Sequence, residues 1–165
     1  GASAGPGETA GPGETAVSDD GVVEPSAEGG LPEEDALDQL NARRRVSQAR
    51  TQVDGHSVAQ LASKYPGLVS PLETSPSGDH KFSAAEIFDE HEKLRDRFGD
   101  SVILLLSTDY GKRQKVKGKA LWVTFYDGNF SGVAAVKAWC RRSFPEFSGS
   151  DLENACTART LRPGR

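Results

Sequence analysis

The side chains that most often carry catalytic or metal chemistry are few in this chain and far apart. Its histidines are His56, His80 and His91, and its cysteines are Cys140 and Cys156, without a Cys-x-x-Cys pair. Nucleophilic catalysis needs a nucleophile beside a base, and a zinc site needs ligands at characteristic spacings. Neither pattern occurs, nor does a phosphate-binding loop or a dinucleotide fingerprint. The sequence argues against an enzyme, and we expect no catalytic residue, metal site or cofactor.

Cys140 and Cys156 admit two interpretations. They pair as a disulfide if the chain matures in an oxidising compartment, and they are two ordinary buried thiols if it does not. Asn129 begins the glycosylation sequon Asn-Phe-Ser, which is used on secreted chains. The sequon therefore favours the disulfide and a secreted protein.

Length and charge restrict the classes of protein that fit. A chain of 165 residues is long enough for one domain with tails. Its formal net charge of −4 gives no general reason to expect a nucleic-acid partner. It has no run of about 18 apolar residues, so we expect no insertion into a membrane.

Composition divides the chain into four parts. Residues 1–30 are rich in Gly, Pro, Glu and Ala and have few large apolar groups. Such a segment cannot bury enough surface to offset the entropy of ordering it. We predict a disordered acidic tail at 1–30, a helical extension at 31–56, an α/β domain at 57–161 and a flexible C-terminal tail at 162–165.

The centre of the predicted domain is two strands, at 101–107 and 119–126, followed by a helix at 131–144 begun by Ser131. Side chains of a strand alternate between its two faces. In the second strand, one set faces a core and the opposite set carries two large aromatics. The core set is Leu121, Val123 and Phe125, and the opposite set is Trp122, Thr124 and Tyr126. The opposite face either binds a partner or packs beneath a second layer of this chain.

The clearest helix signals lie at 83–98. Ser83 and Glu86 form a capping box at its start, and Gly99 is the expected stop. His91 lies at the edge of the apolar face of this helix. A lone histidine there is more often a packed core residue than a ligand or base.

Weaker patterns supply the remaining elements. They predict a helix from residue 31, a short helix at 57–65, an irregular strand at 67–73 and a last strand at 155–161. The order within the domain is then strand, helix, strand, strand, helix, strand. This order is that of the ferredoxin-like βαββαβ sandwich, in which both helices cover one sheet face and leave the other open. The open face would be the one to which Trp122 and Tyr126 point.

A basic connection joins the two central strands. Its cations are Lys112, Arg113, Lys115 and Lys117. They could contact phosphate, but an exposed hairpin loop is the ordinary location of such charges.

Residues 126–135 read Tyr-Asp-Gly-Asn-Phe-Ser-Gly-Val-Ala-Ala, and a helical stretch then ends in Ser-Phe-Pro-Glu at 143–146. This segment resembles the part of subtilisin prodomains that reads Tyr, a short gap, Phe-Ser-Gly-aromatic-Ala-Ala, then a helix and a Pro-hydrophobic step into the last strand. Those prodomains share the predicted topology. In that family Phe-Ser-Gly lies in the third strand, whereas here the pattern puts it at a helix start.

A second resemblance precedes the first along the chain. Residues 58–65, Val-Ala-Gln-Leu-Ala-Ser-Lys-Tyr, followed by Ser-Gly-Asp at 77–79 and Phe-Asp-Glu-His at 88–91, are similar to a stretch of parvulin prolyl isomerases. The Gly-Gly-Asp motif of that family is reduced, and its paired catalytic histidines find no match in order. A decayed parvulin-like segment joined to a prodomain-like fold resembles the secreted microneme proteins of apicomplexan parasites that mimic a subtilisin prodomain.

The prodomain resemblance implies an inhibitor of a subtilisin-like serine protease, located in a secretory organelle such as the microneme. The open sheet face would pack on the protease, and the C-terminal tail would lie extended in the active-site cleft by strand addition. The implied protease contacts on the sheet are Trp122, Thr124 and Tyr126. Those in the tail are Thr160, Leu161, Arg162, Pro163, Gly164 and Arg165.

Two other classes remain as alternatives. A degenerate parvulin-like prolyl isomerase is the first. The second is an RNA-recognition domain, because residues 117–125 faintly resemble the strand of that family that carries its base-stacking aromatics. Lys119 stands where the first of those aromatics is expected, and the net charge is −4, so we expect no nucleic-acid partner.

Overall fold

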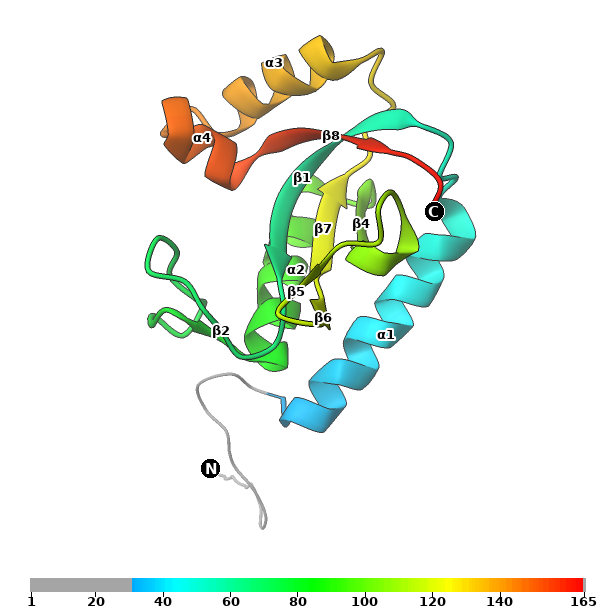
Figure 1. Ribbon diagram of the computed structural model, residues 1–165. Coiled ribbons are helices and arrows are strands. Elements are labelled where there is room, and N and C mark those ends of the chain that lie inside the picture. The colour runs from blue at the N-terminus through cyan, green and yellow to red at the C-terminus, as the bar shows by residue number, and fades with distance from the viewer. Residues whose placement is uncertain (1–30, 165) are drawn as a thin grey trace, which may run out of the picture.

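The structure is a computed structural model that describes residues 31–164, so the tail predicted at 1–30 and Arg165 lie outside the described residues. The helices are α1 (Glu33–Arg50), α2 (Ala84–Phe98), α3 (Val133–Ser143) and α4 (Gly149–Ala155), with a 3-10 turn η1 (Ser107–Asp109). The strands are β1 (His56–Lys64), β2 (Leu68–Val69), β3 (Lys81–Phe82), β4 (Val102–Leu106), β5 (Lys115–Val116), β6 (Lys119–Ala120), β7 (Trp122–Tyr126) and β8 (Thr157–Leu161). The protein is therefore a mixed α+β structure (Figure 1).

Four strands form the main sheet, in the order β4-β7-β1-β8, and every neighbouring pair is antiparallel. Helix α2 lies between β1 and β4 in the chain, and α3 and α4 lie between β7 and β8. The short pairs β2-β3 and β5-β6 form two separate ribbons. The last strand of the chain is thus an edge strand beside the first.

The helix predicted at 57–65 is wrong, because these residues form β1, a central strand. Both of its faces are covered: Val58 belongs to one core cluster, whereas Ala59 and Leu61 belong to another. Pairing with β7 on one side and β8 on the other decides the conformation against local helix propensity. The strand predicted at 67–73 is correspondingly reduced to β2, which pairs only with β3.

Other predicted elements are confirmed, with shifted ends. The strand at 101–107 is β4, the last strand is β8, and the helix from residue 31 is α1. Helix α2 begins as predicted, since the Ser83 side chain accepts a hydrogen bond from the Glu86 backbone, and it ends at Gly99 with φ of 86°.

Two predicted boundaries are corrected. In the strand expected at 119–126, only β7 joins the main sheet, because residues 119–120 fold back as β6 onto β5. The helix expected from Ser131 begins at Val133 instead, and its N-cap, Gly132, gives no side-chain hydrogen bond.

The two faces of the sheet are both covered. On the helix face, Trp122 packs with residues of α1 and α2, and Tyr126 packs with residues of α2 and α3. The opposite face, which we call the loop face, carries a buried cluster of Val58, Ile103, Leu105, Val123, Phe125 and Leu161. Figure 1 shows α2 behind the sheet and the loop with β5 and β6 in front of it.

The prediction that Trp122, Thr124 and Tyr126 lie on an open face is therefore wrong. Trp122 and Thr124 are only 7% and 3% exposed, and Tyr126 is half-buried. The side chains on both faces of β7 are apolar enough to be buried. Alternation along the strand therefore separates the two sets of side chains correctly, but it does not decide which set the helices cover. These side chains therefore pack beneath a second layer formed by the chain itself.

Helix α1 protects one edge of the sheet. The backbone N–H of Leu104 on β4 donates a hydrogen bond to Ser47 Oγ at 2.9 Å. Arg44 donates two hydrogen bonds to the Asp109 carboxylate, at 2.8 and 2.6 Å, and so fixes the helix to the turn after β4. A covered edge strand cannot recruit a further strand. The edge at β8 is the other end of the sheet.

Candidate functional site: strand β8, the tail and the adjoining cleft

Strand β8 pairs with β1 alone, over the register from His56 with Leu161 to Gln60 with Thr157. Its outer side has no strand partner among residues 31–164. An edge strand of this kind presents backbone N–H and C=O groups to which an extended peptide can add. The sheet therefore has an edge without a strand partner at β8, whereas α1 covers the edge at β4.

The tail after β8 begins at a buried anchor. Leu161 is fully buried in the loop-face cluster, whereas Arg162 and Pro163 are exposed and Gly164 is half-buried. Of the predicted tail contacts, Leu161 therefore cannot fill a pocket of a partner without leaving the core. Thr160 is half-buried in the strand, and Arg165 lies outside the described residues.

The tail runs beside the loop that follows η1. The Gly111 N–H donates a hydrogen bond to the Arg162 carbonyl at 2.9 Å. Gly164 lies so close to the Arg113 guanidinium that a Cβ added at this glycine would stand 2.7 Å from Arg113 Nε. The loop therefore positions the first residues after β8.

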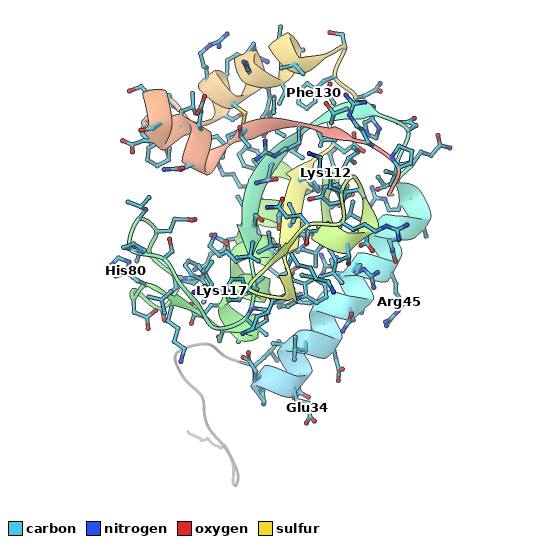
Figure 2. All side chains as sticks on the ribbon, viewed as in Figure 1. Glu34, Arg45, His80, Lys112, Lys117 and Phe130 are labelled. Carbon is cyan, nitrogen blue, oxygen red and sulfur yellow. A yellow bond between two sulfur atoms is a disulfide. The ribbon has the colours of Figure 1, made fainter. Side chains whose placement is uncertain are left out.

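A cleft of about 490 Å³ opens on the loop face between this loop and strands β1 and β8. Its cations are Lys112, Arg159 and Arg162, and its neutral polar groups include Gln60 and Ser63. Arg159 Nε donates a hydrogen bond to Gln60 Oε1 at 3.2 Å. Figure 2 labels Lys112 on the loop in front of the sheet. No carboxylate lines the cleft, so its charge is positive.

Tyr110 forms the apolar wall of the cleft. Its ring packs edge-on against Phe125 with the ring centroids 5.5 Å apart, and burial raises the pKa of its hydroxyl to about 12. The neighbouring Asp109 is held by Arg44 and also accepts a hydrogen bond from the Leu106 N–H at 2.8 Å. This carboxylate is therefore turned to α1 and does not neutralise the cleft.

The histidines do not gather into a site. His91 is fully buried and its Nδ1 lies 2.9 Å from Thr124 Oγ1, which confirms the prediction of a packed core residue. His56 lies between Asp54 and Asp127, and His80 is exposed with its Nδ1 2.7 Å from the Glu73 carbonyl oxygen. Within residues 31–164 no group of three or more His, Cys, Asp or Glu side chains is arranged so that it could hold a metal ion.

His56 joins the start of β1 to the end of β7. Its Nδ1 lies 2.6 Å from Asp54 Oδ1, and its Nε2 lies 2.9 Å from Asp127 Oδ2. Burial lowers the pKa of His56, but the hydrogen bonds to Asp127 and Asp54 outweigh burial and raise it above the ordinary value. The cluster therefore links the start of β1 to the residue that follows β7.

Cys140 and Cys156 form a disulfide, with an S–S distance of 2.09 Å. This bond joins α3 to the residue before β8, across the segment that contains α4. The interpretation as two separate thiols is therefore wrong. The disulfide fixes the position of the edge strand from which the tail departs.

Sequence reasoning missed the cleft for a specific reason. Arg159 and Gln60 come together only because β1 pairs with β8, and residues 57–65 were predicted as a helix. The basic connection between the two central strands was the one sequence feature that pointed to the cleft, because its Lys112 lines one wall of it.

A comparison with models of protein families finds no match, and neither curated proteins nor solved structures give a significant match to this chain. No helix among residues 31–164 is long and apolar enough to cross a membrane.

Proposed function

We propose that this protein inhibits a subtilisin-like serine protease by presenting strand β8 and the tail after it. The proposal is supported above all by the position of β8, which is an edge strand of a four-stranded antiparallel sheet and is followed directly by the exposed residues Arg162 and Pro163. The strand order β4-β7-β1-β8 and the chain order βαββαβ support a ferredoxin-like fold of the kind that subtilisin prodomains share.

The docking surface of this proposal is the loop face, not the helix face. Since Trp122 and Thr124 are buried beneath helices, they stabilise the core and are not contacts of the protease. The surface opposite α2 and α3 consists of the loop after η1, the cleft beside it and the tail. The protease would meet this surface while the tail enters its active-site cleft.

Strand addition supplies the binding energy of the tail. An extended peptide in a protease cleft gains backbone hydrogen bonds along its length, and its side chains fill specificity pockets. Leu161 holds the tail to the core at one end, so only the residues after it need to be ordered on binding. Preorganisation of this kind lowers the entropic cost of association.

A secretory location is part of the same proposal. The disulfide between Cys140 and Cys156 and the exposed sequon at Asn129 support an oxidising compartment such as the microneme.

No observation favours the two alternative functions, an RNA-recognition domain and a parvulin-like isomerase. Trp122 and Tyr126 of β7 pack against helices, and Phe125 is fully buried in the loop-face cluster, so these aromatics cannot stack on RNA bases. The described histidines do not form the pair that a parvulin-type isomerase needs.

The test is a titration against a subtilisin with a chromogenic peptide substrate. We expect tight inhibition by the full chain and slow loss of the inhibitor by cleavage. Removal of residues 162–165 should raise the inhibition constant by about two orders of magnitude, because strand addition and pocket contacts are lost. Removal of residues 1–30 is the matched control and should leave the constant unchanged. Equal inhibition by both truncated chains would exclude the tail from the mechanism.

A further inference from the structure

The lining of the cleft on the loop face carries several cations and no carboxylate. Lys112 comes from the loop after η1, Arg159 from β8, and Arg162 from the tail. Three separate segments of the chain therefore direct positive charge to one hollow of about 490 Å³. This volume lies within the range of roughly 300 to 1,000 Å³ that is usual for binding pockets.

These cations are not neutralised from within the fold. None of the ion pairs found among residues 31–164 includes Lys112, Arg159 or Arg162. Arg44, by contrast, is satisfied by two hydrogen bonds to Asp109. The hydrogen bond from Arg159 to Gln60 uses one guanidinium N–H and leaves its charge uncompensated. Like charges gathered in one hollow repel, and an anion relieves that repulsion.

We infer that this cleft binds an acidic, extended peptide segment of the partner protein. Guanidinium groups recognise carboxylates with paired hydrogen bonds, and the amide and hydroxyl of Gln60 and Ser63 can bond a peptide backbone. The inference deepens the proposed function, on which it rests for the identity of the partner: the protease surface that meets the loop face would carry Asp or Glu side chains.

A peptide fits this cleft better than RNA does. Base stacking needs an exposed aromatic face, but the Tyr110 ring is packed against Phe125 and is half-buried. The net charge of −4 opposes a polyanion that spans more than the cleft. A short run of carboxylates contacts only the cleft, so the positive charge of the cleft is sufficient to attract it.

The experiment measures direct binding, without a protease, by fluorescence anisotropy of a labelled oligoglutamate peptide added to the full chain. An oligolysine peptide of the same length and an oligouridylate are the comparison probes. We expect saturable binding of oligoglutamate that weakens as salt is added, and no binding of oligolysine. Because no protease is present, failure here is distinguishable from failure of the inhibition proposal.

Matched variants locate the site. In Lys112→Gln/Arg159→Gln the dissociation constant should rise at least about tenfold, because two cations of the cleft are lost. Arg141→Gln/Arg142→Gln removes the same charge from exposed positions on α3 and should change the constant less than about twofold. Circular dichroism checks that both variants fold.

Each other outcome overturns the inference. Equal loss in both variants means that binding follows net charge and not the cleft. Oligouridylate binding as tight as that of oligoglutamate means a nucleic-acid site. Binding that appears only after residues 1–30 are removed means that the chain's own acidic segment takes the place assigned to the partner. That segment has no Lys or Arg and carries Glu8, Glu14, Asp19, Asp20, Glu24 and Glu28.

Discussion

The Nδ1 atom of His91 lies 2.9 Å from the Oγ1 atom of Thr124, between the middle of α2 and the middle of β7. This contact fixes the helix face of the sheet and places Thr124 in the core. Burial lowers the pKa of His91 to about 3, and the charges of Arg43 and Arg95 act in the same direction. His91 is therefore neutral in the folded protein at physiological pH.

Acid should destabilise the folded protein through His91. In the unfolded chain His91 takes up a proton near pH 6.5, whereas in the folded chain it does so only near pH 3, so stability falls as the pH drops from 6.5 toward 3. Between pH 7 and pH 5 this residue should lower the free energy of unfolding by about 2 kcal/mol. Urea unfolding at several pH values measures the effect. The His91→Gln variant should lose this component, and an identical pH slope in both proteins would contradict the assignment.

His56 should act in the opposite direction. Its raised pKa means that the charged form is stabilised by folding, so its contribution is fully present below pH 6.5 and is lost as the pH rises through the folded value. The stability difference between the wild type and His56→Gln should therefore be larger at pH 6 than at pH 9. A difference that grows with pH would refute the role of Asp54 and Asp127.

Lys64 is a buried cation whose removal should be costly. Only 1% of the residue is exposed, and its Nζ lies 2.9 Å from Glu90 Oε1 and 2.8 Å from Glu73 Oε1. Loss of one partner leaves buried charge without compensation, so Lys64→Met should lower the free energy of unfolding by about 3 to 5 kcal/mol. The double variant Lys64→Met/Glu90→Gln should recover part of this loss. A Lys64→Met variant within about 1 kcal/mol of the wild type would show that the pair is not buried as described.

The disulfide should be a major source of stability. Cys140 and Cys156 are 16 residues apart, and closing a loop of this size stabilises a protein by about 3 kcal/mol. A reducing agent should therefore lower the urea midpoint of the wild type. It should have no effect on the Cys140→Ala/Cys156→Ala variant. An unchanged midpoint for the wild type would mean that the two thiols are not bonded in solution.

Part of the fold could be predicted from the sequence because some helices and strands carry their own start and stop signals. Helix α2 carries its own start at Ser83 and its own stop at Gly99, and β4 is a short apolar run between turns. These signals do not depend on distant residues. The strand β1 does depend on them, since its spacing of Val58, Leu61 and Ala62 also suits a helix and only pairing with β7 and β8 decides the state.

The candidate site was less predictable for a related reason. Alternation along β7 gave the two sets of side chains, but both sets are apolar enough to be buried, and which one lies under α2 is decided by packing. The role of the tail is implied by the resemblance alone and stays a prediction; the structure shows that Arg162 and Pro163 are exposed. The cleft requires β1, β8 and the loop together, so no single stretch of sequence contains it.

The inhibition constant against a subtilisin, measured for the full chain and for the chain lacking residues 162–165, tests the central claim most directly. The proposed function predicts tight inhibition by the full chain and a constant about a hundredfold higher without the tail. Absence of inhibition by the full chain at micromolar concentration would contradict it. The protein would then be a binding domain whose partner is defined by the cleft on the loop face.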